Sequence, residues 1–243
     1  MYIEDVKHLQ RLKNNGFIPD TVIDIGVSNG EWFSEAYKIW PNAKYFLYEA
    51  RKKEETKFTE LRIPSQINYE IEFDKALGYV FGDRDCKILT FYKLDAGSSF
   101  YEEDTKFPRT KELKKIYDAE KELSKKHIVN AFLKLDVQGA EYEIIESIGR
   151  NTMFRYIEVI QVELSLLPYN KNAPLSSKVC SILSRMGFEL FDFGPGFRRE
   201  SDGVLYQIDA VFVKKESKLR DTKNKVYWLA EHNFEKSLES VRK

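Results

Sequence analysis

The sequence has few of the residues from which metal centres and disulfide frameworks are built. Its 243 residues include two cysteines, Cys86 and Cys180, and three histidines. Two cysteines so far apart do not make a disulfide framework, and no C-x-x-C pair offers a zinc site. We expect two buried thiols in a reducing compartment, which indicates a cytoplasmic protein.

Long apolar runs and an excess of one charge are also missing. No segment approaches the roughly 20 apolar residues that cross a bilayer, and the acidic start Met1–Val6 is no signal peptide. Lys and Arg together number 39, as do Asp and Glu, so the formal net charge is zero. This balance does not suit a general nucleic-acid binder, and we interpret the basic run Arg51-Lys52-Lys53 as a solvated helix start. We expect a soluble protein with no membrane span and no nucleic-acid partner.

The sequence does have an apolar content of 42%, which is enough for a sizeable core. It also has segments typical of strands that alternate with segments typical of helices. Apolar runs typical of strands cover 21–26, 45–48, 68–77, 87–93, 131–135, 156–164, 189–193 and 204–213. Helical patterns cover 2–14, 31–40, 54–61, 110–126, 140–148, 175–186 and 226–241. This alternation predicts an α/β fold with a mostly parallel sheet and helices on both faces. The turn-rich stretch Gly194-Pro195-Gly196 makes the last two strands an antiparallel pair.

An acidic residue and two glycines follow the first buried strand. Gly26 and Gly30 allow a tight turn and a close approach of the backbone to a ligand. A dinucleotide site would need G-x-G-x-x-G, but Ser28 stands where the middle glycine would be. Glu49, at the end of the second strand about 20 residues further on, can accept hydrogen bonds from both ribose hydroxyls. This pattern favours S-adenosylmethionine as the cofactor, with a binding set of Asp24, Gly26, Ser28, Asn29, Gly30, Glu49 and, from a later strand end, Asp136.

A second acidic turn follows the strand 131–135. The run Leu133-Lys134-Leu135-Asp136-Val137-Gln138-Gly139-Ala140-Glu141 brings Asp136 to the carboxyl edge of the sheet, and Gly139 lets the chain turn into the next helix. Glu141 falls in the first turn of that helix, where the helix dipole favours a carboxylate. The plainer interpretations are a capping residue for Asp136 and a helix-start charge for Glu141.

These segments together resemble the FkbM-type methyltransferases, a class I family that depends on S-adenosylmethionine. The resemblance rests on Ile23–Gly30, Leu133–Glu141, Val162-Glu163 and the closing strand Tyr206–Val213. It implies a class I (Rossmann-like) methyltransferase sheet, mostly parallel with an antiparallel strand near the C-terminus.

The resemblance also implies methyl transfer to a hydroxyl, often on a sugar or a polyketide-like natural product. Carried over by position, Asp24, Gly26 and Gly30 line the cofactor and Glu49 holds its ribose. Asp136 and Glu141 are the expected catalytic residues, nearest the transferred methyl group.

The proton of the acceptor hydroxyl needs a base or a metal as it leaves. The histidines His8, His127 and His232 are poorly placed, so Asp136 is the better candidate base. No metal is expected; the alternative is Mg²⁺ held by Asp136 and Glu163, which each end a central strand.

The expected organisation is an N-terminal helical addition (1–20), a methyltransferase domain (21–214) with an insert at about 94–129, and a C-terminal helical tail (215–243). Exposed aromatic residues such as Tyr169 and Phe197, with Arg198-Arg199 nearby, could frame a small-molecule or saccharide acceptor. Two other functions stay open: an NAD-type oxidoreductase on a similar sheet, and a non-catalytic cofactor-binding module. The sequence identifies neither the acceptor nor the oligomeric state.

Overall fold

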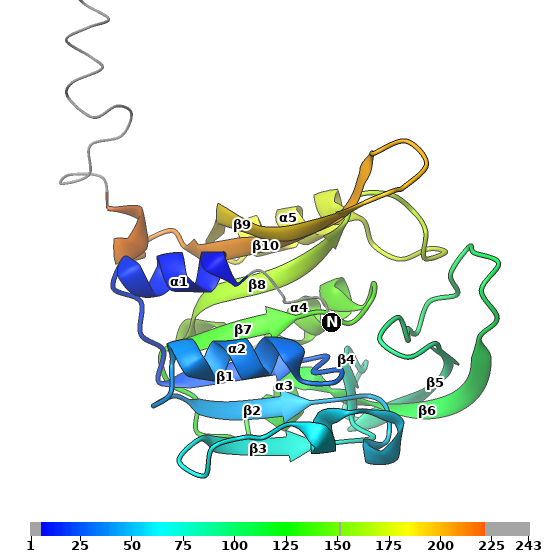
Figure 1. Cartoon of the computed structure of the whole chain (residues 1–243), viewed down its shortest axis with the longest axis horizontal. Coiled ribbons are helices and arrows are strands. Elements are labelled where there is room, and N and C mark those ends of the chain that lie inside the picture. The colour runs from blue at the N-terminus through cyan, green and yellow to red at the C-terminus, as the bar shows by residue number, and fades with distance from the viewer. Residues whose placement is uncertain (1–5, 151, 222–243) are drawn as a thin grey trace, which may run out of the picture.

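The computed structural model describes residues 6–150 and 152–221, and its main sheet has the strand order β3-β2-β1-β7-β8-β10-β9 (Figure 1). The strands are β1 Thr21–Ile25, β2 Lys44–Tyr48, β3 Asn68–Glu72, β7 Ala131–Leu135, β8 Ile157–Ser165, β9 Phe188–Arg198 and β10 Leu205–Lys214. Only β10 runs against its neighbours, being antiparallel to both β8 and β9. The predicted mostly parallel sheet with an antiparallel strand near its end is confirmed.

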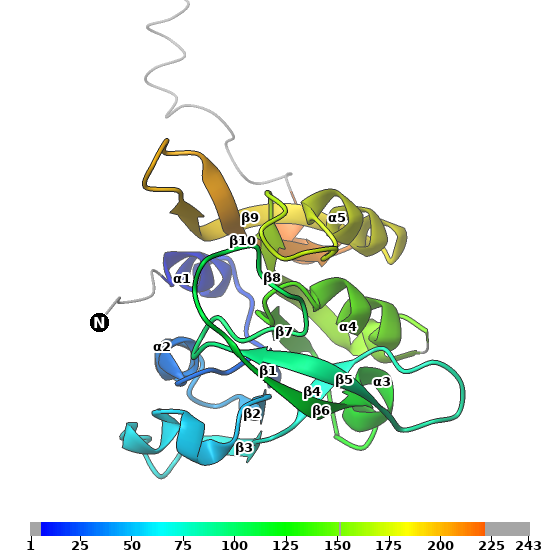
Figure 2. The same ribbon diagram turned by 90° about the vertical axis from the view of Figure 1, so that its right-hand side faces the viewer.

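Helices cover both faces of this sheet (Figure 2). One face packs against α1 Lys7–Asn14 and α2 Glu31–Ile39, and the other against α3 Ala119–Leu123, α4 Glu141–Ile148 and α5 Ser176–Arg185. Every residue of β1 and β7 is buried, as expected of central strands with helices on both sides. Short 3-10 segments are η1 Lys53–Glu55, η2 Phe58–Glu60, η3 Thr152–Tyr156 and η4 Lys218–Arg220.

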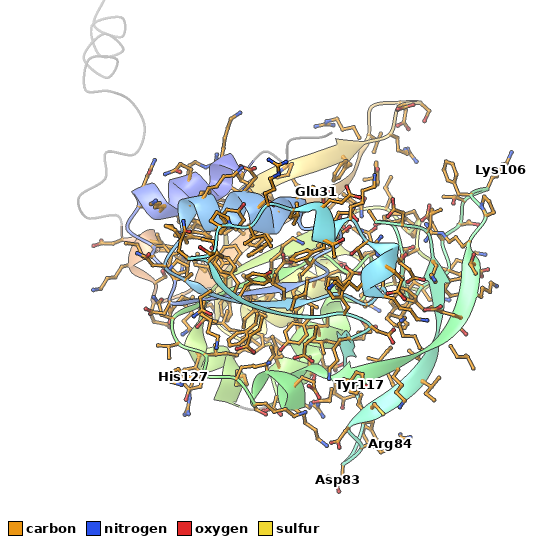
Figure 3. The ribbon with its side chains drawn as sticks, turned by 60° about the horizontal axis from the view of Figure 1, so that its bottom comes forward. Glu31, Asp83, Arg84, Lys106, Tyr117 and His127 are labelled. Carbon is orange, nitrogen blue, oxygen red and sulfur yellow. The ribbon has the colours of Figure 1, made fainter. Side chains whose placement is uncertain are left out.

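A second, three-stranded sheet lies beside the carboxyl ends of the main strands (Figure 1). Its order is β4-β6-β5, with β4 Ala76–Gly78, β5 Cys86–Lys93 and β6 Thr110–Asp118. Figure 3 shows that it extends from Asp83 and Arg84 at one end to the loop with Lys106 at the other. That loop, between β5 and β6, reaches the carboxyl ends of β2 and β7 and contributes to the site described below.

The predicted helix over 110–126 is wrong in its first half, because residues 110–118 form β6. All of β5 pairs antiparallel with β6. Alternation along the strand buries Lys114 and Ile116 and leaves Leu113 78% exposed. Lys, Glu and Leu favour a helix locally, but pairing with a distant strand overrides that preference.

Several other predicted elements differ from the structure or lie outside its description. The predicted turn at Gly194-Pro195-Gly196 lies within β9, which continues to Arg198 before the hairpin turns back into β10. The segment 54–61 forms η1 and η2 in place of one helix, and 68–77 divides into β3 and β4 of different sheets. The division falls at Asp74, whose φ of 55° turns the chain out of the main sheet. The helix predicted over 226–241 lies outside the described residues. In the part of the chain that the structure describes, no helix is long and apolar enough to cross a membrane.

Candidate active site

The turn after β1 owes its shape to left-handed backbone at Gly26 and Gly30, whose φ angles are 89° and 85°. A Cβ at Gly26 would lie 2.8 Å from the carbonyl carbon of Asp136 and closer still to its oxygen. A Cβ at Gly30 would lie 2.7 Å from the Phe58 ring. Glycine is therefore required at both positions, and at Gly26 it lets the first turn contact the turn after β7.

Glu49, at the end of β2, is buried beside this turn. The backbone N–H of Ser28 donates to Glu49 Oε2 at 2.6 Å. Arg51 donates to Glu49 Oε1 through its backbone N–H at 2.8 Å and through Nε at 3.1 Å. Each carboxylate oxygen has two lone pairs, so Oε2 can accept a further hydrogen bond. The side chain of Asn29 is not bonded to Glu49. Its Oδ1 accepts a hydrogen bond from the backbone N–H of Lys57 at 3.0 Å.

Arg51 is a site residue that the sequence did not indicate. The basic run was expected to be solvated, but the Arg51 side chain is only 3% exposed. Besides Glu49 it contacts Ser28 Oγ at 3.1 Å and Asp95 Oδ1 at 2.6 Å. Arg51 therefore links the first turn, the end of β2 and the β5–β6 loop. Its two acidic partners lie on either side of it in the chain, so the basic run alone gave no signal of them.

Lys134, on β7, joins the ends of β1 and β7. Its side chain is 4% exposed, and Nζ lies 3.2 Å from Asp24 Oδ1 and 3.4 Å from Asp136 Oδ2. It also donates to the Gly26 carbonyl oxygen at 3.2 Å. Burial raises the pKa of Asp24 to about 6, and the nearby ammonium of Lys134 opposes part of that rise. Lys134 thus provides a buried positive charge between two acids, which a lone lysine in an apolar strand did not reveal.

The turn after β7 presents Asp136 and buries Glu141. The Asp136 side chain is 31% exposed. Glu141 accepts hydrogen bonds from the backbone N–H groups of Val137 at 2.9 Å and Gly139 at 3.0 Å. Burial raises the pKa of Glu141 to about 7. Of the two expected catalytic residues, Asp136 is therefore open to a ligand, whereas Glu141 lies beneath the turn and holds its backbone.

Gln138 lies between two carboxylates. Its Nε2 donates to Asp136 Oδ1 at 3.1 Å and to Glu163 Oε2 at 2.9 Å. Burial, together with the charge of Asp136, raises the pKa of Glu163 well above its usual range. The two acids proposed as alternative Mg²⁺ ligands therefore both accept from one amide group. This donor set does not fit a metal ion, and the described residues contain no group of three or more His, Cys, Asp or Glu placed to hold one.

Two segments far away in the chain hold the backbone of this second turn. The Gln138 carbonyl oxygen accepts from Ser99 Oγ at 2.6 Å and from Asn170 Nδ2 at 3.0 Å. Ser99 comes from the β5–β6 loop, and Asn170 from the connection between β8 and α5. Both side chains are almost fully buried. Ser99 lies in the insert expected at about 94–129, and nothing in the sequence pattern indicated Asn170.

A cleft of about 540 Å³ opens next to Gln138. Its walls come from the turn after β7, the β5–β6 loop, the β8–α5 connection and the β9–β10 hairpin: Gln138, Glu103, Thr105, Leu167, Pro168, Tyr169, Arg199, Tyr206 and Gln207. Tyr169 and Tyr206 contact edge to face, with ring centroids 5.9 Å apart. Arg199 is ion-paired with Asp202. Tyr169 and Arg199 of the predicted acceptor frame thus line this cleft.

The histidines lie apart from this arrangement. His8 is buried between α1 and the sheet, where Nε2 contacts Gln161 Oε1 at 2.9 Å. His127 is exposed, on the side of the molecule opposite Lys106 of the β5–β6 loop (Figure 3). His232 is outside the described residues. In the described chain, Asp136 is the acid that combines partial exposure with a place beside both turns.

The FkbM methyltransferase domain matches residues 24–190, more than half of the chain. A search of curated proteins gives no match. Among solved structures, the chain is similar to precorrin-6y C5,15-methyltransferase from Geobacter metallireducens GS-15, with 13% identity, 85% of this chain and 86% of that chain covered, and a TM-score of 0.46. It is also similar to magnesium protoporphyrin IX methyltransferase from Synechocystis PCC 6803 with bound SAH, with 9% identity, 86% and 80% covered, and a TM-score of 0.48.

Proposed function

The chain belongs to the FkbM family and is an S-adenosylmethionine-dependent methyltransferase with the class I fold, and we propose that it methylates a hydroxyl of a saccharide or a related natural product. The observation that carries the proposal is the position of Asp136. Its carboxylate is partly exposed, lies at the contact between the two glycine-containing turns, and accepts from Gln138 on the wall of the cleft. A hydroxyl in the cleft would approach a base there.

The residues around the first turn fit the proposed cofactor. Gly26 and Gly30 have no side chain between the backbone and a ligand, and Glu49 Oε2 keeps a lone pair for a ribose hydroxyl. Asp24 and Lys134 form a buried ion pair beneath the contact of the two turns. When bound, S-adenosylmethionine supplies an activated methyl group on a sulfonium. We assign to the protein the alignment of the acceptor and the exclusion of water.

Asp136 is the proposed acceptor of the hydroxyl proton. A sugar hydroxyl has a high pKa, and a positioned base typically contributes about 10²–10⁴-fold to the rate. Glu141 is assigned a positioning role, because its carboxylate is occupied by the N–H groups of Val137 and Gly139. Tyr169 and Tyr206 provide apolar ring surface beside polar groups, which suits a sugar ring.

We propose that the reaction needs no metal, because the Gln138 amide donates to the two acids that would have to bind one. The test is turnover in EDTA followed by addition of Mg²⁺. Full activity in the chelator supports the proposal. Loss of activity that Mg²⁺ restores would contradict it.

The main experiment measures formation of S-adenosylhomocysteine with a panel of glycosides as acceptors. Asp136→Asn should lower turnover about 10²–10⁴-fold and leave cofactor affinity within about twofold. Asp104→Asn is the matched control, because Asp104 is an exposed acid on the neighbouring loop, 75% exposed. Equal turnover of wild type and Asp136→Asn on the same acceptor would remove Asp136 as the base.

Calorimetry separates this function from the other two that the sequence leaves open. Binding of S-adenosylmethionine is expected, and binding of a nicotinamide dinucleotide in its place would favour an oxidoreductase. A non-catalytic module would bind the cofactor and methylate none of the acceptors offered. The family match and the Ser28 position both favour the methyltransferase.

A further inference from the structure

The backbone of Gln138 is held in a conformation that a non-glycine residue rarely adopts. Its φ is 54°, in the left-handed region. Such residues persist where the surrounding structure fixes them, and they occur often at functional sites. Here the fixing groups are Ser99 Oγ and Asn170 Nδ2, which both donate to the Gln138 carbonyl oxygen. The side chain of Gln138 therefore leaves the turn in one defined direction.

The orientation of the amide group at the end of this side chain is also fixed. As the proposed base, Asp136 is ionised and only accepts hydrogen bonds, so the group that faces Asp136 Oδ1 must be the NH₂ of the amide. The distances of 3.1 Å and 2.9 Å place both acceptors within hydrogen-bond range of Nε2. Exchanging oxygen and nitrogen would place Oε1 against Asp136 Oδ1, so the amide cannot flip without losing its bond to Asp136.

This arrangement leaves one polar atom of the Gln138 side chain without a partner. Among the described residues none donates a hydrogen bond to Oε1, whereas Nε2 and the backbone carbonyl oxygen are both occupied. Oε1 is not buried, and Gln138 lines the cleft. Covalent geometry keeps Oε1 next to Nε2, and Nε2 is bonded to Asp136. A hydrogen-bond acceptor thus lies beside the proposed base.

We propose that Gln138 determines which acceptors react, by accepting a hydrogen bond from a second hydroxyl of the acceptor while its amide holds Asp136 in position. The proposal rests on the proposed function. The acceptor class is then a diol: one hydroxyl faces the Asp136 carboxylate and loses its proton, and the neighbouring hydroxyl donates to Gln138 Oε1. An acceptor with a single hydroxyl lacks the second contact.

The kinetic test uses a methyl glycoside that the enzyme methylates and the same glycoside without the hydroxyl next to the methylated one. Wild type should use the deoxy compound with kcat/KM lower by about tenfold or more, the value of one lost hydrogen bond at a fixed polar group. Gln138→Met should lose this preference, with an acceptor KM raised about tenfold and an affinity for S-adenosylmethionine within about twofold. Thr105→Val, on the same cleft, should keep the preference. Equal use of both glycosides by wild type would overturn the proposal.

A double variant that exchanges the residues at positions 138 and 163 tests whether Gln138 positions Asp136 or only stabilises the fold. Gln138→Glu places three carboxylates together. Adding Glu163→Gln restores an amide–carboxylate pair between positions 138 and 163, but still leaves Asp136 facing a carboxylate. The double variant should therefore regain thermal stability and stay about tenfold or more below wild type in kcat. Recovery of kcat together with stability would show that only the fold depends on this pair.

A spectroscopic measurement tests the hydrogen bonds without any acceptor. In the ¹⁵N-labelled protein, the side-chain amide signals of Gln138 are those lost in Gln138→Met. Both hydrogens should exchange slowly with water, and their shifts should move in Glu163→Gln. Fast exchange would overturn the bridge even if no acceptor is found. A wild type that binds the cofactor, shows slow exchange and methylates no glycoside would instead overturn the proposed function.

Discussion

The two turns at the centre of the site are held in different ways. The turn after β1 is closed by its neighbours in the main sheet, because Ser28 and Arg51 both bond to Glu49 at the end of β2. The turn after β7 receives its outer support from Ser99 and Asn170, in two segments that also form the walls of the cleft. The first turn therefore depends mainly on Glu49 at the end of β2, with one link to the β5–β6 loop through Arg51 and Asp95, and the second depends on the segments that surround the cleft.

The largest expected effect comes from the position where the two turns meet. Gly26→Ala forces a left-handed conformation on alanine and pushes its Cβ into the Asp136 carbonyl group. Strain of about 1–3 kcal/mol and overpacking of about 1–3 kcal/mol should lower the free energy of unfolding by about 2–6 kcal/mol. Urea unfolding measures it.

Gly203→Ala is the matched control for that variant. Gly203 also has a positive φ, of 73°, but a Cβ there meets nothing within 4 Å. Only the conformational cost of about 1 kcal/mol is expected. Equal losses in the two alanine variants would show that the close approach of the turns contributes nothing to stability.

The sequence predicted both turns because their signals are local. An apolar run that ends in an acidic residue followed by glycine indicates a buried strand and a tight turn, and Asp24-Ile25-Gly26 and Asp136–Gly139 both have that form. Asp136 is partly exposed at the strand end, as expected. The strands around these turns are confirmed for the same reason, since helices on both faces require continuous apolar runs.

The supports of the turns were missed because their partners are distant in the chain. In the sequence, Arg51 has the pattern of a solvated charge. Only the fold brings Asp95, on another loop, into contact with it. Asn170 contacts a backbone oxygen, which leaves no pattern in side-chain type. The error over 110–118 has the same origin, because β6 exists only through its pairing with β4 and β5. Local propensity describes a segment alone and gives no information on what it will pair with.

The next largest effect is a pH dependence of the free energy of unfolding, which arises from Glu141 in the second turn. Burial raises the pKa of Glu141 from 4.5 to about 7, so the folded chain keeps a proton that the unfolded chain releases. The stability from this group is fully present below pH 4.5 and is lost as pH rises through 7. Over that window wild type should lose up to about 3 kcal/mol relative to Glu141→Gln, from 1.36 kcal/mol per pKa unit.

Urea unfolding at several pH values measures this difference. Glu146→Gln, on the same helix, is the control and should keep the wild-type slope, because Glu146 accepts none of the hydrogen bonds of the turn. Identical slopes in wild type and Glu141→Gln would mean that Glu141 is ionised throughout this range in the folded protein.

The first turn should show its effect in cofactor binding. Glu49→Gln removes the charge that pairs with Arg51 and weakens the proposed contact with the ribose. A hydrogen bond to a charged group contributes about 1.5–3 kcal/mol, so the Kd for S-adenosylmethionine should rise about 10–100-fold. Calorimetry measures it, with the exposed Glu54→Gln as the control. An unchanged Kd would assign Glu49 to the fold of the turn alone.

The smallest effects are expected from Ser99 and Asn170, the two side chains that hold the second turn. They test most directly whether the two turns are held independently. Ser99→Ala and Asn170→Ala each remove one donor from the Gln138 carbonyl oxygen, worth about 1 kcal/mol, and should lower kcat about fivefold. Affinity for S-adenosylmethionine should not change, because among the described residues neither side chain forms a hydrogen bond with the first turn. The two losses should not add in the double variant, because both donors act on one oxygen atom. If they add, or if cofactor affinity falls with them, the two turns are not held independently and the comparison fails.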